Sequence, residues 1–211
     1  AVLLLGVAPL ALSDFRLSLL AKYLCYAIVA VGVSLAWGRG GLMVLGQGVF
    51  FGLGGYAMAM HLKLADAGPG ELPDFMLLYG QLEELPWWWR PFTSPVFALA
   101  ATVLLPMLVA LLLGLLIFRR GVRGAYFAIL SQALCAAFAI LLIGQQGTTG
   151  GTNGLTDIQG FFGYDLNDPV NQRMVYFIIA AALLAMLGIA WQLMRSRYGE
   201  LLVAVRDGEQ R

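Results

Sequence analysis

Residues 95–118 read PVFALAATVLLPMLVALLLGLLIF, and this stretch decides the fold. It contains no charged side chain and is rich in Leu, Val and Ala. About 20 predominantly apolar residues are enough for a helix to cross the hydrocarbon core of a bilayer. The stretch therefore predicts a membrane-spanning helix.

The rest of the chain follows the same pattern. Of its 211 residues, 60% are hydrophobic and only 12% are charged, whereas a soluble domain carries about 25% charged residues. Four further runs are long enough to cross a bilayer, at 17–36, 41–62, 125–143 and 173–194. The opening run, 1–12, would rise only about 18 Å as a helix, so it predicts a truncated sixth span. The sequence thus predicts an all-α polytopic membrane protein with about six transmembrane helices.

The chain finishes in a charged segment with a helical pattern. In RSRYGELLVAVRDGEQR, residues 195–211, the side chains of Tyr198, Leu201, Leu202 and Val205 fall on one stripe of a helix. So short a helix needs a surface on which to dock. With this tail in the cytoplasm, eight Lys and Arg residues lie on its side of the membrane and four on the other, as the positive-inside rule expects. The sequence therefore predicts a cytoplasmic amphipathic C-terminal helix.

Several classes of function find no support in the residues. The net charge of +1 gives no reason to expect nucleic acid as a partner. Cys25 and Cys135 stand inside apolar runs without the spacing of a disulfide or metal site, and the sequence carries no catalytic motif. Every Asp and Glu falls in a predicted loop or in the tail, unlike the mid-membrane acid of many ion-coupled transporters. A non-enzymatic protein without a metal site is predicted.

Two connections are longer than simple turns. The first, 63–94, holds Trp87–Trp89 beside Arg90 and is predicted to lie at the outer membrane interface; a ligand-stacking platform is the alternative. His61, just before it, is predicted to be an interfacial residue. The second, 144–173, is dense in Gly, Thr and Asn, and it predicts turns with short helices. It lacks the Lys of a phosphate-binding loop.

The run at 41–62 is unusually rich in small residues. They recur at helical spacing and predict a nearly bare helix face, formed by Gly41, Gly48, Gly52, Gly55 and Ala59. Such a face lets another helix approach closely or leaves room for a translocation path, and both interpretations stay open. Glycine at this density also permits a break in the helix. Gln47 beside this face is costly in lipid, so we expect it to turn inward.

Six segments spread over nearly the whole chain carry a resemblance to a known family. They are WGRGGLMVLGQGVFFGLGGYAMAM (37–60), GELPDFM (70–76), LPWWWRPF (85–92), RGAYFAILSQAL (123–134), TGGTNGLT (149–156) and SRYGELLVAVRDGE (196–209). In these segments the chain resembles the permeases of ABC importers for branched-chain amino acids and urea. PDFM and LPWWW indicate the second, longer permease subunit of the urea importer. Gln47 departs from the His that is common in the family, and Glu200 stands at an often basic position.

The resemblance implies partners and a location. The chain would be a bacterial inner-membrane permease subunit, paired with a second permease subunit and two cytoplasmic ATPase subunits, and supplied by a periplasmic substrate-binding protein. ATP and Mg would bind to the ATPases, so this chain would hold no cofactor. Residues 1–211 would form a single permease domain, incomplete at both ends, in which 194–211 begin the cytoplasmic coupling region.

The resemblance and the residue patterns together predict two sets of site residues. The ATPase-coupling set is Tyr198, Gly199, Leu201, Leu202, Val205, Arg206, Asp207 and Glu209, in which the last three would supply polar contacts. The set predicted for the translocation path or for helix packing is Gln47, Gly48, Gly52, Gly55, Ser131 and Gln132.

The predicted function is therefore that of an ABC permease, with urea as the first substrate and alternating access driven by ATPase movement. A branched-chain amino acid permease of the same family is the first alternative. A passive channel for small neutral solutes is the second. The channel fits the glycines and the missing mid-membrane charges, but it does not explain the amphipathic tail.

Overall fold

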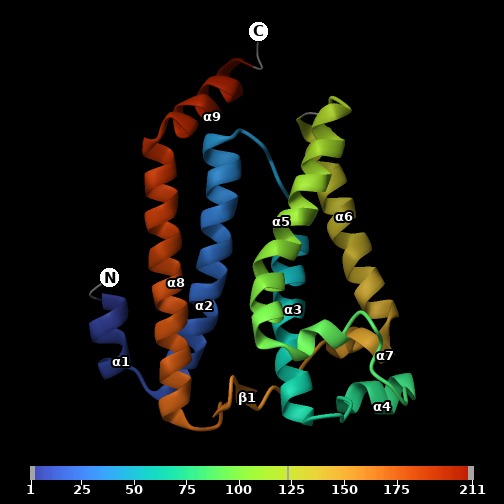
Figure 1. Cartoon of the computed structure of the whole chain (residues 1–211). Helices are drawn as coiled ribbons and strands as arrows, with labels where there is room; N and C mark the ends of the chain where they lie inside the picture. Colours follow the sequence, from blue (N-terminus) through green and yellow to red (C-terminus); the bar gives the residue numbers. More distant parts are fainter. Residues whose placement is uncertain (1–2, 123, 209–211) are drawn as a thin grey trace. The chain divides into compact units, whose positions relative to one another are not determined.

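The computed structural model describes residues 3–122 and 124–208, which are mainly helical and divide into two units (Figure 1). Unit 1 consists of Ala1–Val44 and Asn167–Arg211, and unit 2 consists of Leu45–Leu166. Among the described residues, four helices are long and apolar enough to cross a membrane. They are Asp14–Arg39, Pro95–Ile117, Ala125–Gly144 and Pro169–Arg195.

Unit 1 is built on two long helices that pack side by side. α2 (Asp14–Ser34) continues into a π-helical turn, η2 (Leu35–Arg39), and packs along α8 (Pro169–Arg195). The buried contact is formed by Leu17, Ala21 and Leu24 from α2 with Tyr176, Ala180 and Leu183 from α8. Small Ala side chains on both helices let the two backbones approach closely.

The ends of unit 1 are tied by polar contacts. Arg173 of α8 binds Asp14 of α2 with an N–O distance of 2.8 Å. The Tyr176 hydroxyl donates a hydrogen bond to the carbonyl of Leu4 at 2.7 Å. This bond holds the short N-terminal helices, η1 (Leu3–Val7) and α1 (Ala8–Ala11), against α8. At the other end α8 is followed by α9 (Arg197–Gly208).

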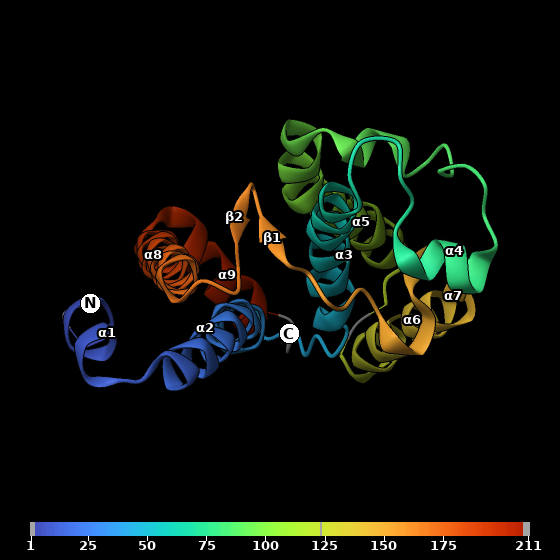
Figure 2. The same ribbon diagram turned by 90° about the horizontal axis from the view of Figure 1, so that it is seen from below.

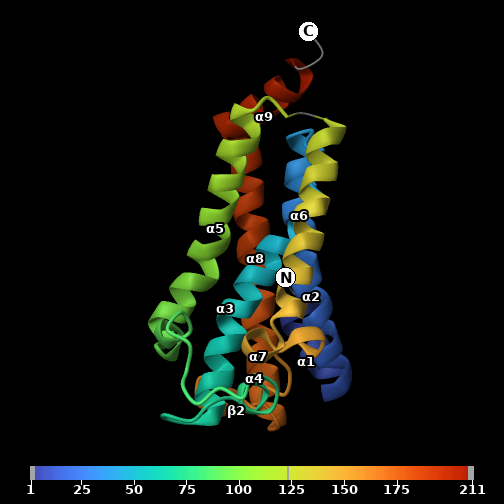
Figure 3. The same ribbon diagram turned by 90° about the vertical axis from the view of Figure 1, so that its right-hand side faces the viewer.

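Unit 2 is organised around α3 (Gln47–Ala67), which packs against both α5 (Pro95–Arg119) and α6 (Ala125–Gly144) (Figure 3). Its main apolar cluster joins α3, α5 and the segment between them through Ala57, Met60, Leu64, Phe75, Met76, Phe92, Ala98 and Ala101. A helix with neighbours on two sides can carry glycine and polar residues, because less of its surface faces lipid.

The connections of unit 2 contain short elements. α4 (Asp74–Gly80) and α7 (Gln146–Thr149) lie side by side (Figure 2), and η3 (Arg90–Thr93) and η4 (Gly151–Asn153) are single turns. β1 (Gly160–Phe161) and β2 (Tyr164–Asp165) form a small antiparallel hairpin. The short helices predicted within 144–173 are confirmed, whereas the all-α prediction missed this hairpin. Its two turn residues, Phe162 and Gly163, both have positive φ, as a two-residue hairpin turn of type I′ requires.

The predicted spans agree with the structure in four cases and differ in one. The runs at 17–36, 95–118, 125–143 and 173–194 are confirmed as long apolar helices. The run at 41–62 has a different boundary, because the helix begins only at Gln47 and continues to Ala67. α3 is about 31 Å long at 1.5 Å per residue, but its glycines and polar residues keep it outside the four apolar helices. The count of six stays a prediction.

Candidate functional site

The start of α3 is fixed to α6 by Ser131. The Ser131 hydroxyl accepts a hydrogen bond from the backbone N–H of Leu45 at 3.1 Å and donates to the carbonyl of Ala128 at 2.9 Å. Gly46 lies so close to the Ser131 carbonyl that a side chain there would collide with it. Both hydroxyl functions of Ser131 are therefore occupied, and Ser131 holds the chain where α3 begins.

This contact places the start of α3 well inside the length of α6. Ser131 lies about 9 Å along α6 from its first residue, Ala125. Non-helical backbone at membrane depth is tolerated where it is packed on protein or lines a cavity. Residues 41–46 are not helical, so the chain between α2 and α3 has the break that the glycine-rich sequence permits.

Gln47 and Gln132 occupy different environments near this break. Gln47 is the first residue of α3 and is half-buried. Within the described part of the chain, its amide makes no hydrogen bond to another residue. Gln132 is exposed on α6 beside the buried Ser131. The two amides are thus not brought into one closed pocket with Ser131.

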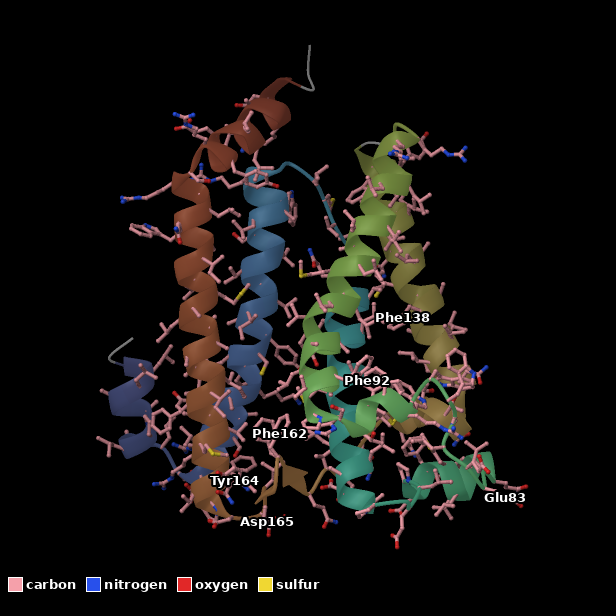
Figure 4. The ribbon with its side chains drawn as sticks, in the orientation of Figure 1. Glu83, Phe92, Phe138, Phe162, Tyr164 and Asp165 are labelled. Carbon is pink, nitrogen blue, oxygen red and sulfur yellow. The ribbon has the colours of Figure 1, made fainter. Side chains whose placement is uncertain are left out.

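The predicted glycines of α3 do not share one neighbour. A β-carbon on Gly48 would lie 2.8 Å from Cys135 Sγ, and one on Gly52 would lie 3.4 Å from Phe138 Cε1, both on α6. Figure 4 labels Phe138 beside α3. Gly55 has no neighbouring atom within 4 Å of such a carbon. The predicted bare face is therefore divided. Gly48 and Gly52 pack on α6, while Gly55 faces open space in this chain.

One position of the predicted small-residue face needs correction, and one close contact was missed. Gly41 precedes α3 in the non-helical segment and has a φ of +67°, so it cannot belong to the helix face. Gly54, which was not singled out, packs most tightly on α5, where its β-carbon would lie 3.0 Å from the carbonyl oxygen of Thr102. The signal that could have found it is Pro106, which lies four residues after Thr102 and removes the usual hydrogen-bond donor to that carbonyl.

The far end of α3 is bound by the segment 157–161 and by η3. His61 is only 5% exposed, and its Nδ1 lies 2.8 Å from the carbonyl oxygen of Phe92. The Lys63 ammonium donates to the carbonyl of Asp157 at 3.1 Å, and the Asp66 carboxylate accepts from the N–H of Gln159 at 2.8 Å. His61 is therefore buried within the chain, and the prediction that it lies at the membrane interface stays a prediction.

The three tryptophans predicted at the outer interface do not behave alike. The indole N–H of Trp89 donates to the carbonyl of Thr148 at 3.0 Å, and its ring packs edge-on against Phe92. Trp87 and Trp88 are 75% and 47% exposed. Trp89 is thus a structural tie between η3 and α7, and only its two neighbours are available at the surface.

A cleft of about 560 Å³ opens beside these residues, lined by the turns around Gly68–Leu72 and Glu83–Leu85. Glu84 pairs with Arg90 across it at 3.2 Å, and Glu83 projects away from the helices (Figure 4). Among the described residues, no group of three or more His, Cys, Asp or Glu is placed to hold a metal ion.

The predicted amphipathic C-terminal helix is confirmed as α9. The chain turns at Ser196, whose hydroxyl donates to the carbonyl of Leu193 at 2.7 Å. Tyr198 and Leu201 are 54% and 61% exposed, whereas Leu202 is half-buried. Gly199 is buried, and its β-carbon would lie 2.6 Å from the Met194 carbonyl oxygen. The outward apolar face therefore centres on Tyr198 and Leu201.

The remaining predicted coupling residues divide further. Arg206 binds within its own chain, because its Nη1 donates to the carbonyl of Gly38 at 3.0 Å. Its Nε donates to the Asp207 carboxylate at 2.9 Å. The side chain of Val205 and the whole of Glu209 lie outside the described part of the structure. The prediction that Arg206 and Asp207 contact an ATPase is not tested by these bonds.

The four apolar helices define the class of the protein. On α5, for example, Leu104, Leu108 and Leu111 are exposed along the length of the helix. A water-soluble chain of this size rarely exposes so large an apolar surface. The chain is a multi-pass helical membrane protein.

The comparisons with known proteins then give the family. The model of the branched-chain amino acid transport system permease component family matches residues 15–211, and the chain belongs to this family. It is 26% identical, over 236 aligned residues, to the high-affinity branched-chain amino acid transport system permease protein LivM of Salmonella typhimurium, and equally to LivM of Escherichia coli. Each match covers 99% of this chain but 48% of the relative, so the chain spans about half the length of these relatives. No solved structure matches.

Proposed function

We propose that the chain is part of the permease subunit of an ATP-binding-cassette importer in a bacterial inner membrane. The observation that carries this proposal is α9, which exposes Tyr198 and Leu201 on a short amphipathic helix directly after a membrane-crossing helix. Burial of two such side chains is worth about 1.5–3 kcal/mol each. In a member of this family, a cytoplasmic ATPase subunit is the partner that such a face would take.

The mechanism follows from where α9 is attached. Two ATPase subunits would bind ATP and Mg, so this chain needs no cofactor of its own. Their movement would shift α9 and, through the turn at Ser196, α8. Together with a second permease subunit, the helices would alternate between outward-open and inward-open states. A periplasmic binding protein would deliver the substrate on the side opposite to α9.

The proposed substrate is urea. This assignment rests on the resemblance of the segments 70–76 and 85–92 to those of urea permeases. A small neutral amide is bound by hydrogen bonds alone, and Gln47 at the break before α3 offers a free amide within the described residues. Weak contacts of this kind favour fast release, so specificity would reside mainly in the binding protein.

Branched-chain amino acids are the second candidate. The observation that favours them is that both LivM relatives, which match along almost the whole of this chain, are branched-chain amino acid permease proteins by name. The two candidates share the same partners, the same coupling helix and the same direction of transport. They differ only in the solute that the assembled importer carries.

The experiment that tests the proposal is uptake by vesicles that contain the full-length subunit, its sister permease and both ATPases. We expect uptake of labelled urea that requires both ATP inside and the binding protein outside, with little uptake of labelled leucine. The opposite preference would replace urea by the amino acid. Urea uptake that needs neither ATP nor binding protein would contradict the importer and favour a passive channel.

A further inference from the structure

Arg206 connects α9 to the end of α2. Its side chain leaves α9 on a different side from Leu201, which follows from 100° per residue in a helix. Its Nη1 reaches the carbonyl of Gly38, in η2, at 3.0 Å. Asp207 binds the Nε of the same guanidinium at 2.9 Å and so fixes its orientation.

The carbonyl that Arg206 binds belongs to the last turn of the helix, where carbonyls lack an N–H donor within the helix. The last carbonyls of a helix have no partner in the next turn and carry the negative end of the helix dipole. In η2, the carbonyls of Leu35, Ala36 and Trp37 accept from the N–H groups of Gly40, Leu42 and Gly41. The carbonyl of Gly38 accepts from Arg206 instead, so a cation from α9 caps the end of α2.

Gly41 makes room for this contact. Its φ is +67°, and a β-carbon there would lie 2.5 Å from Cγ and 3.1 Å from Cδ of Arg206. A side chain at this position would therefore push the arginine away from Gly38. The absence of a side chain at Gly41, just beyond η2, thus leaves space for the aliphatic part of the Arg206 side chain.

We infer that Arg206 is a positioning residue that transmits the movement of α9 to α2. This inference rests on the proposed function. α9 is joined covalently to α8 through Ser196, and Arg206 adds the second attachment, to the helix that packs along α8. A displacement of α9 then moves both long helices of unit 1 together. Without Arg206, α9 pulls on α8 alone.

The test uses the full-length importer in vesicles and compares Arg206→Ala, Arg206→Lys and the double variant Tyr198→Ser with Leu201→Ser. For Arg206→Ala we expect normal capture of the ATPase, but about fivefold or more less solute moved per ATP hydrolysed, since a hydrogen bond to a charged group is lost. This ratio does not depend on the amount of folded protein. Arg206→Lys should restore part of it, because an ammonium can still donate to one carbonyl.

A second variant examines the contact itself. Gly41→Ala should lower the transport ratio more in the wild-type background than in the Arg206→Ala background, because removing the colliding stem leaves only the backbone strain of alanine at a φ of +67°. An equal additional loss in both backgrounds would contradict the contact.

The outcomes separate this inference from the proposed function. Wild-type transport by Arg206→Ala would overturn the positioning role, and loss of ATPase capture would show that Arg206 binds the ATPase directly. If the Tyr198 and Leu201 variant still captures the ATPase, the proposed function of α9 fails instead.

Discussion

Gly54 of α3 lies against the backbone carbonyl of Thr102 in α5, with only 3.0 Å between that oxygen and the position of a β-carbon on Gly54. Thr102 is four residues before Pro106, so its carbonyl lacks the usual helical N–H donor from residue 106. The Thr102 hydroxyl binds the carbonyl of Ala98 at 2.9 Å and does not fill this place. Gly54 therefore packs on α5 at the place where Pro106 removes a helical hydrogen bond.

Gly54→Ala should destabilise the protein, because the obstructing atom is backbone and cannot rotate away. Overpacking of this kind costs about 1–3 kcal/mol, which lowers the melting temperature by about 2–4 °C per kcal/mol in a chain of this size. Thermal unfolding of the full-length subunit in detergent measures the change. Gly55→Ala is the matched control, since no atom lies within 4 Å of its β-carbon. Equal effects at both positions would contradict the packing.

Ser131→Ala should loosen the chain before α3. The substitution removes the acceptor for the Leu45 N–H in a part-buried hydrogen bond, and such a bond contributes about 0.5–1.5 kcal/mol. Hydrogen exchange followed by mass spectrometry should show faster exchange in the peptide that contains Leu45. Gln132→Ala, at the exposed neighbouring position, should leave the exchange unchanged. Slow exchange in the Ser131 variant would show that another contact holds this segment.

The orientation of the helices is open to chemical labelling. In a variant without Cys25 and Cys135, single cysteines at Glu83 and Asn153 should react with an impermeant reagent added outside, and one at Arg120 should react only after the membrane is opened. The reason is the excess of basic residues on the Arg120 side. Outside labelling at position 120 would reverse the topology and place α9 where no cytoplasmic ATPase could bind it.

The long helices could be predicted from the sequence because hydrophobic length alone specifies a span. The boundary of α3 could not. A run of glycines permits a helix or a break, and the choice is made by the contact between Leu45 and Ser131, which are far apart in the sequence. The hairpin at 160–165 escaped for a similar reason, since its turn depends on Phe162 adopting a φ of +49°, which residue preference does not favour.

The candidate site was predictable where it depends on a single element. The helical spacing placed Tyr198, Leu201, Leu202 and Val205 on one stripe of α9, of which the structure exposes Tyr198 and Leu201 and half-buries Leu202. The bond of Arg206 to the carbonyl of Gly38 could not be predicted, because nothing in the local sequence of Arg206 indicates a carbonyl that comes from another helix. Gly54 was missed because its partner is an unsatisfied carbonyl on α5, which no pattern within α3 reveals.

Capture of the ATPase by α9 tests the central claim most directly. In the full-length subunit, Tyr198→Ser with Leu201→Ser removes the exposed apolar pair, and Arg197→Ser with Glu200→Ser is the matched control, which removes one positive and one negative charge from exposed positions of the same helix. The ATPase would bury both side chains, and each burial contributes about 1.5 kcal/mol or more. Their loss should weaken binding of the purified ATPase subunit by about a hundredfold, with membrane insertion unchanged. The control should bind as the wild type does. Wild-type capture by the Tyr198 and Leu201 variant would contradict the assignment of α9 as the coupling helix.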